Sequence, residues 1–209
     1  MTDKNQDFEK YYTNKCNDIK WFEPYIQPKM IEEWNNGYIK PGINLLDVGG
    51  GCSLDSVFYA TNGVNTDVID FSQNALKKLS TMADFYGVDI NGRHASILDS
   101  AELEDVFGKY DVITDNGCFH HIDPEDRSKY FESVYELLKP EGILYIRAVS
   151  EYMDPSKDNK LKAYRISSDD ILQVEVLKHF KVVELSLFDS VSISEKKPKM
   201  WFIKLQKRS

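Results

Sequence analysis

The side chains best suited to acid–base or metal chemistry gather in one stretch, TDNGCFHHIDPEDRSKY, at residues 114–130. It contains His120 and His121, which are half of the histidines in the chain. Adjacent side chains diverge and no histidine follows at helical spacing, so a metal site is the weaker interpretation. A histidine near its ordinary pKa can instead take a proton or orient a substrate at neutral pH. A plainer alternative stays open, in which both histidines organise the loop.

A second chemical feature is the glycine-rich segment LLDVGGGCSLDS, in which an apolar run leads into Gly49, Gly50 and Gly51. Glycines lack Cβ atoms, so a ligand can lie directly against their backbone. A dinucleotide fingerprint would need glycine at position 54, where leucine stands. Asp47 disfavours a neighbouring pyrophosphate and suits a ligand with positive charge. Asp70 ends the next predicted strand, where a carboxylate can accept hydrogen bonds from both hydroxyls of a ribose.

Alternating apolar runs and helical patterns position these two features. β-Rich runs separated by turn signals predict strands at 43–48, 65–71, 89–99, 110–114, 142–149, 180–188 and 199–206. Helical spacing with plausible caps predicts helices at 54–61, at 73–86 between Ser72 and Gly87, from Asp123 to about 138, and from Ser167 to about 179. The helix after Asp123 would begin with Pro124, which suits a first helical position.

This order predicts an α/β protein with a mostly parallel, Rossmann-like sheet and helices on both faces, closed by an antiparallel terminal pair of strands. Ligands bind such sheets beyond the carboxyl ends of the strands. Both chemical features follow predicted strands, so we expect them to border one pocket.

At these residues the sequence resembles the class I S-adenosylmethionine-dependent methyltransferases, and more narrowly their small-molecule branch related to thiopurine and thiol methyltransferases. The resemblance runs over WFEPYIQPKMIEEWNNGYIKPG, LLDVGGGCSLDSVFYATNGVNTDVIDFSQNAL and DNGCFHHIDPEDRSKYFESVYELLKPEG. It implies a seven-stranded sheet with a reversed last strand and S-adenosyl-L-methionine as cofactor, released as S-adenosyl-L-homocysteine. Many members have a third glycine where this chain has Ser53, which suits a helix start and could cap it.

The resemblance also implies roles for individual residues. Those expected to bind the cofactor are Asp47, Gly49, Gly50, Gly51, Asp70, Phe71, Ile97, Leu98, Asp99, Asp115, Asn116 and Trp21. Those considered for catalysis are His120, His121 and Asp115, and those for the substrate are Phe119, Tyr11, Tyr12, Phe22 and Arg165. Core packing is the alternative for the aromatic residues, and a helix cap is the alternative for Asp99. Arg165 and Arg147 could bind an anionic group of the substrate, and a surface ion pair is the alternative for both.

The composition suits a single structural domain, with residues 1–40 as an N-terminal helical lid and 41–209 as the cofactor-binding part. Cys16, Cys52 and Cys118 form no zinc or disulfide pattern, and no signal peptide or membrane span is recognisable. We therefore expect a cytoplasmic protein without metal, as a monomer or weak homodimer. The net charge of −8 argues against nucleic acid as a partner, and no membrane partner is expected.

The sequence thus predicts an enzyme that methylates a small molecule at sulfur, nitrogen or oxygen by in-line transfer. Two alternatives stay open. One is a methyltransferase acting on protein or nucleic acid, although the chain lacks the (D/N)PP(Y/F) motif and the Pro-Cys nucleophile often used on nucleic-acid bases. The other is a non-catalytic protein that only binds the cofactor.

Overall fold

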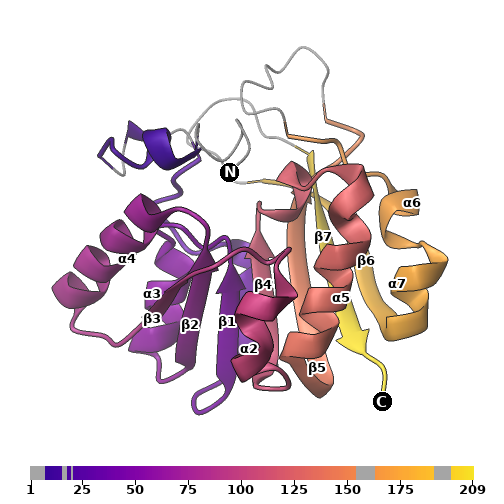
Figure 1. The fold of residues 1–209 in the computed structure, drawn as a ribbon, viewed down its shortest axis with the longest axis horizontal. Helices are drawn as coiled ribbons and strands as arrows, with labels where there is room; N and C mark the ends of the chain where they lie inside the picture. Colours follow the sequence, from indigo (N-terminus) through magenta and orange to yellow (C-terminus); the bar gives the residue numbers. More distant parts are fainter. Residues whose placement is uncertain (1–7, 16–17, 20, 154–162, 191–198) are drawn as a thin grey trace. The chain divides into compact units, whose positions relative to one another are not determined.

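In the described part of the chain, seven strands form one sheet in the order β3-β2-β1-β4-β5-β7-β6 (Figure 1). A computed structural model describes residues 8–15, 18, 19, 21–153, 163–190 and 199–209, so that Cys16 lies outside the described residues. β1 pairs with β2, β2 with β3 and β4 with β5 in parallel, whereas β7 runs antiparallel to both β5 and β6. The predicted α/β fold with a reversed last strand is confirmed.

The strands are β1 Asn44–Val48, β2 Asn65–Asp70, β3 Asn91–His94, β4 Tyr110–Asn116, β5 Leu138–Val149, β6 Phe180–Asp189 and β7 Lys199–Lys207. The α-helices include α2 Pro28–Asn35, α3 Leu54–Thr61, α4 Gln73–Tyr86, α5 Arg127–Leu137, α6 Ser168–Ile171 and α7 Val174–His179. The chain divides into two compact units, Met1–Glu102 and Leu103–Ser209. Among the described residues, no helix is long and apolar enough to cross a bilayer.

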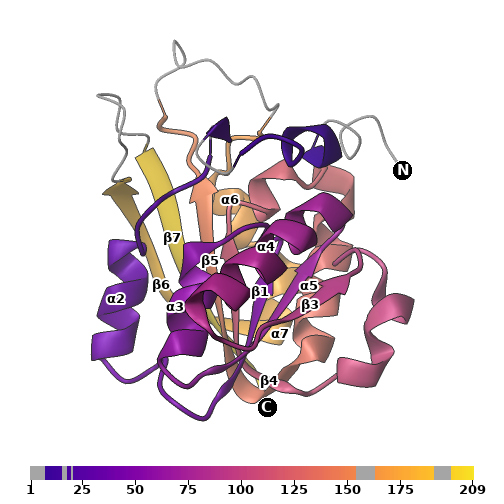
Figure 2. The same ribbon diagram turned by 90° about the vertical axis from the view of Figure 1, so that its left-hand side faces the viewer.

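The first unit contains β1–β3, with α3 packed on β2 and α4 packed on β3. The two helices also contact each other, and they lie side by side in both ribbon views (Figures 1 and 2). Local caps explain why both predicted helices are confirmed. The Ser53 hydroxyl accepts from the backbone N–H of Asp55 and Ser56, and the Ser72 hydroxyl accepts from Ala75. Gly87 ends α4 in the left-handed conformation, at φ 66°.

The second unit contains β4–β7, with α5 packed on β5 and α7 packed on β6. The predicted apolar stripe of α5 is buried, at Tyr130, Phe131, Val134 and Leu137. Pro124 is the first helical residue as predicted, but it begins a 3-10 turn, Pro124–Asp126, and α5 itself begins at Arg127. The side-chain cap expected from Asp123 was wrong, because its side chain makes no capping hydrogen bond.

The capping box at the start of α6 is confirmed, since the side chains of Ser167 and Asp170 satisfy each other's backbone N–H groups. The helix predicted to run from there to about residue 179 is instead two short helices, α6 and α7, interrupted between Ile171 and Val174. Asp115 and Asn116, expected just past the fourth strand, are its last two residues. Both side chains are therefore placed by the sheet and not by a loop.

Candidate functional site

The glycine loop, Gly49–Gly51, requires glycine for two different reasons. Gly49 and Gly51 have φ angles of 63° and 55°, in the left-handed region that side chains disfavour. A Cβ atom on Gly50 would lie 2.7 Å from Oδ2 of Asp47 and 2.8 Å from Cγ1 of Val68. The loop is thus a backbone surface that no side chain of its own can cover.

Asp70 ties this loop to the start of α4. Its Oδ2 accepts the backbone N–H of Gly51 at 3.0 Å, and its Oδ1 accepts that of Ser72 at 2.7 Å. The side chain is buried, with 5% of the residue exposed. Burial raises the pKa of Asp70 to about 7; the two backbone hydrogen bonds oppose the shift, and the carboxylates of Asp47 and Glu9 add to it.

The titration of Asp70 makes the ligand-free chain less stable as pH rises. Its folded pKa of about 7 lies above the ordinary 3.8, so the folded chain binds this proton more tightly than the unfolded chain does. The contribution is complete below pH 3.8 and is lost as pH rises through about 7. Melting temperatures measured from about pH 5 to about pH 8 should fall more steeply for the wild type than for Asp70→Asn. Equal slopes would contradict this ionisation.

Asp47 lies beneath the loop, almost completely buried, and accepts a hydrogen bond from the Ser56 hydroxyl. Its position follows from β1, where it is the penultimate residue. A buried carboxylate is costly without partners, so this hydrogen bond and the neighbouring loop backbone give it a polar surrounding. The predicted acids Asp47 and Asp70 therefore both border the glycine loop, as expected from the sequence.

An aromatic group from the N-terminal segment lies over the same loop. A Cβ atom on Gly51 would overlap the hydroxyl oxygen of Tyr12, which also accepts the indole N–H of Trp21 at 3.2 Å. The Trp21 ring meets the rings of Phe8, Tyr11 and Tyr12 at centroid distances of 5.6, 5.2 and 5.8 Å. Tyr12 therefore lies on the glycine loop, whereas the sequence had predicted a contact with the substrate.

Glu9, which no sequence pattern indicated, anchors this segment. Its carboxylate accepts from the Ser72 hydroxyl and, at 3.3 Å, from the backbone N–H of Asn74 at the start of α4. The N-terminal segment and Asp70 thus meet at the same helix start. Phe71 joins them, with its ring 5.9 Å from that of Phe8. A carboxylate so far away along the chain carries no local signal of such a contact.

The other residues of the first unit that were predicted to bind the cofactor or the substrate differ in burial. Ile97 is buried, Leu98 is half-buried, and Asp99 is exposed. The Asp99 carbonyl accepts the backbone N–H of Glu102 within the turn that follows, which agrees with the alternative of a helix start. Phe22 packs against the cluster that contains Tyr12.

In the second unit, Asp115 organises the loop after β4. Its Oδ1 accepts the backbone N–H of Cys118 at 2.8 Å and of Phe119 at 3.1 Å, and its Oδ2 accepts the Tyr130 hydroxyl at 2.8 Å. Burial raises the pKa of Tyr130 well above 10, so the phenol keeps the proton that it donates. The Asp115 carboxylate therefore fixes the backbone of the loop that carries the histidines and joins it to α5 through Tyr130.

The two histidines differ in environment. His120 is buried, and its Nδ1 accepts the backbone N–H of Val149 at the end of β5 at 3.2 Å. Burial, with His121 and Arg147 adding to it, lowers the pKa of His120 well below 6.5. His120 is therefore neutral at pH 7, and its proton is on Nε2. The His121 ring lies 4.5 Å away, centroid to centroid, and is less buried.

Two further residues assigned to the substrate are held by the protein itself. The Phe119 ring is fully buried and lies 5.0 Å from Tyr130 and 5.3 Å from Phe131, which agrees with the alternative of core packing. Arg165 donates to the carbonyl of Met153 at 2.7 Å. Asn116 pairs in register with Arg147 of β5. Across the described part of the chain, no group of three or more His, Cys, Asp or Glu side chains is placed to hold a metal ion.

Comparison with known proteins identifies the domain that carries both features. Residues 46–144 match the family model described as a methyltransferase domain, a span that includes the glycine loop, Asp70 and the histidines.

Relatives and solved structures agree with this match. An uncharacterized methyltransferase of Schizosaccharomyces pombe is 29% identical over 110 residues, which cover 52% of this chain and 72% of that protein. The arsenite methyltransferase of Aquipseudomonas alcaligenes is 28% identical over 185 residues, covering 79% of this chain and 51% of that protein. The fold is that of the Burkholderia thailandensis 1,6-didemethyltoxoflavin-N1-methyltransferase, with a TM-score of 0.74, 19% identity, and 98% and 87% of the two chains covered. Residues 46–144 thus form a methyltransferase domain, and the fold is that of the S-adenosylmethionine-dependent methyltransferases.

Proposed function

We propose that the chain transfers the methyl group of S-adenosylmethionine to a small molecule, at a sulfur, nitrogen or oxygen atom. The observation that carries the proposal is the glycine loop with Asp70 bonded to it and an aromatic side chain resting on its surface. A Cβ atom at Gly50 or Gly51 would collide with its neighbours. The loop therefore offers bare backbone beside buried carboxylates, as a cationic nucleoside ligand requires.

S-Adenosylmethionine, when bound, supplies a methyl group activated on a sulfonium. Gly49–Gly51 and Asp47 would hold its methionine part, and Asp70 would accept from its ribose hydroxyls. Phe71, Ile97, Leu98 and Asp99 are the residues proposed for the adenine side. Trp21 and Tyr12 would cover the loop and exclude water, and their ring faces suit a cation.

The class of acceptor follows from charge and from the relatives. A protein with net charge −8 is unsuited to phosphate-rich partners. The arsenite and 1,6-didemethyltoxoflavin methyltransferases are named for small acceptors. We infer the same class here, which favours small-molecule transfer over modification of protein or nucleic acid. The narrower relation to thiopurine and thiol methyltransferases stays a prediction, as do the cytoplasmic location, the lid at 1–40 and the monomeric or weakly dimeric state.

The acid–base groups of the second unit favour an acceptor that needs little help from a base. Asp115 already accepts three hydrogen bonds, and the Nδ1 lone pair of His120 accepts from Val149. Thiolates and neutral amines attack without a strong base, so positioning supplies most of the rate enhancement. We assign Asp115 and His120 to holding the loop, and His121 to orienting the acceptor or receiving its proton.

This assignment predicts different outcomes for two substitutions of His120. Asparagine can present its side-chain oxygen near the position of Nδ1 and accept from Val149, whereas alanine leaves that N–H without its acceptor. His120→Asn should keep the single-turnover transfer rate within about threefold of the wild type, and His120→Ala should lower it about tenfold or more. Equal loss in both variants would instead assign the proton transfer to His120. His121→Ala, measured alongside, should lower the rate without lowering the melting temperature.

A panel assay tests the proposal directly. The purified chain is incubated with S-adenosylmethionine carrying a labelled methyl group and with separate thiols, amines, phenols and carboxylates. We expect chain-dependent label in at least one thiol, amine or phenol. S-Adenosylhomocysteine binding without transfer to any acceptor would support the alternative of a non-catalytic binder.

A further inference from the structure

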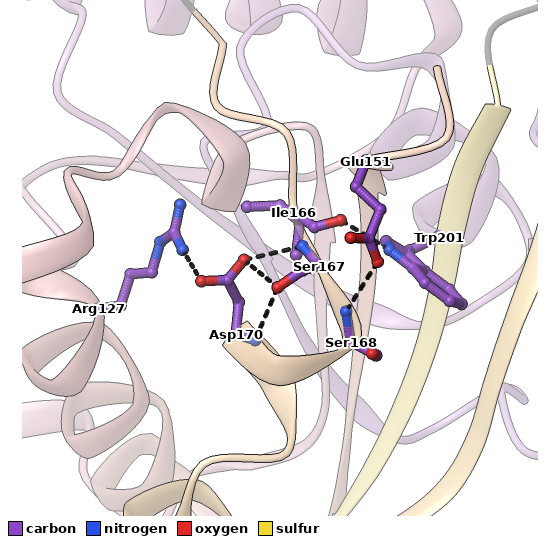
Figure 3. A network of polar contacts seen from close by, with 7 residues as sticks. All are labelled: Arg127, Glu151, Ile166, Ser167, Ser168, Asp170 and Trp201. Atoms are coloured by element: carbon purple, nitrogen blue, oxygen red, sulfur yellow. Dashed lines mark hydrogen bonds and ion pairs between the residues drawn. The ribbon is translucent and has the colours of Figure 1, made fainter.

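Arg127, the first residue of α5, has no role in the proposed chemistry, yet it is one of the most buried charged residues described. Its residue exposure is 3%, and its Nη1 is paired with Oδ1 of Asp170 (Figure 3). The other oxygen of Asp170 accepts from the backbone N–H of Ser167 at 2.8 Å and from its hydroxyl at 2.9 Å. One carboxylate thus joins Arg127 to the capping box of α6.

The guanidinium of Arg127 also lies close to two aromatic rings. Its central carbon is 5.5 Å from the ring centroid of Phe119 and 5.6 Å from that of Tyr164. A planar, weakly hydrated guanidinium suits this position, whereas an ammonium group offers neither the flat face nor the fork of donors. Phe119 belongs to the histidine loop (residues 119–123), and Tyr164 belongs to a segment that we term the return arm (residues 164–170).

Tyr164 connects the same two segments independently. Its backbone N–H donates to the His120 carbonyl at 2.7 Å, and its hydroxyl donates to Asp123 at 2.6 Å. Asp123, which the sequence had assigned to a helix cap, is therefore a partner of the return arm. The histidine loop is therefore held both by Asp115 and by Tyr164.

The return arm is in turn fixed to the end of β5. Ile166 donates to the Val149 carbonyl, and its own carbonyl accepts from the backbone of Glu151 and, at 2.8 Å, from the Trp201 indole (Figure 3). The backbone N–H of Ser168 donates to Glu151 at 3.4 Å. Val149 also donates to His120. The histidine loop, the return arm and the end of β5 therefore form one connected set of contacts. The ion pair of Arg127 with Asp170 belongs to this set.

Stability alone gives little reason for a charge in this position. Replacing a buried ion pair by apolar side chains of similar volume is often neutral or stabilising, because desolvation offsets the Coulombic attraction. What such a pair can supply is one fixed arrangement of the segments that it joins. We propose that Arg127 is a positioning residue that sets the histidine loop against the return arm, and thereby the geometry of the acceptor. This inference rests on the proposed function.

The test compares Arg127→Met and Arg127→Lys with Lys129→Met, which removes an exposed charge from the same helix. Arg127→Met should lower kcat/KM for the best acceptor of the panel about 10- to 100-fold, the effect of a small misplacement of reacting groups. The loss should appear mainly as a raised acceptor KM, and affinity for S-adenosylhomocysteine should stay within about twofold. Arg127→Lys should restore only part of the loss, and Lys129→Met should behave as the wild type.

A spectroscopic measurement separates positioning from general destabilisation. The imidazole ¹⁵N signals of His120 report its tautomer, with Nδ1 as an acceptor in the wild type. These signals should shift in Arg127→Met and stay unchanged in Lys129→Met. If Arg127→Met does not fold, the double variant Arg127→Met/Asp170→Asn removes both charges and is measured in its place.

Three results would overturn the proposal: unchanged His120 signals, unchanged acceptor kinetics, or a loss of cofactor affinity equal to the loss of acceptor affinity. A chain that transfers no methyl group would refute the proposed function, not the positioning role. In that case the His120 signals decide the role of Arg127 on their own.

Discussion

Asp70→Ala is expected to weaken binding of S-adenosylhomocysteine about 100-fold or more. The carboxylate accepts the backbone N–H groups of Gly51 and Ser72, so its removal releases both the glycine loop and the start of α4. It also removes the proposed acceptor for the ribose hydroxyls. Above pH 7, where Asp70 is ionised, hydrogen bonds to its charged carboxylate contribute about 1.5–3 kcal/mol each, and a loss of about 3 kcal/mol corresponds to roughly 100-fold in affinity.

Isothermal titration calorimetry with S-adenosylhomocysteine measures this effect. Asp84→Ala is the matched control, because Asp84 is an exposed carboxylate on α4 and should bind the ligand as the wild type does. Asp70→Asn should be intermediate, since its amide oxygen can still accept one hydrogen bond. An Asp70→Ala affinity within about twofold of the wild type would exclude the ribose-binding role.

Gly51→Ala should be the most damaging of the glycine substitutions with respect to both stability and cofactor binding. The residue has a φ of 55°, and a left-handed conformation costs a residue with a Cβ atom about 1–2 kcal/mol. The new Cβ atom would also overlap the hydroxyl oxygen of Tyr12. Relieving this overlap requires the tyrosine or the loop to move, which adds about 1–3 kcal/mol.

Gly87→Ala separates the cost of the left-handed backbone conformation from the cost of the overlap with Tyr12. Gly87 has a φ of 66°, but a Cβ atom added there would have no neighbouring atom within 4 Å, so alanine meets the backbone cost alone. Gly51→Ala should melt at least about 2–4 °C below Gly87→Ala, as expected for each additional 1 kcal/mol. Adding Tyr12→Phe to Gly51→Ala should recover part of the difference. Equal melting temperatures for the two alanine variants would contradict the contact between Tyr12 and the loop.

Elements with strong local signals were predictable from the sequence. The helices Leu54–Thr61 and Gln73–Tyr86 have the predicted bounds, because a serine caps each start and, in α4, a left-handed glycine provides the stop. The α6 capping box lies within four consecutive residues and was recognised for the same reason. Asp47 and Asp70 were placed correctly beside the glycine loop because the ends of parallel strands fix their positions.

Contacts between distant segments could not be predicted from one sequence. Asp123 stands where a helix cap is expected, yet its carboxylate accepts from Tyr164, 41 positions away. Glu9 caps α4 from 63 positions before Ser72, and Arg127 meets Asp170 across 43 positions. The neutral state of His120 depends mainly on burial, and its tautomer depends on an N–H of Val149; local composition reveals neither. The same limit explains why Tyr12 was assigned to the substrate and not to the glycine loop.

Transfer of a labelled methyl group in a cell extract tests the central claim most directly. The purified chain is added to extract with S-adenosylmethionine labelled on the methyl group, and the products are separated into small molecules, protein and nucleic acid. We predict chain-dependent label in the small-molecule fraction, abolished by Asp70→Ala and retained by Asp84→Ala. Label confined to protein or nucleic acid, or no chain-dependent label in any fraction, would contradict the claim that this chain methylates a small molecule.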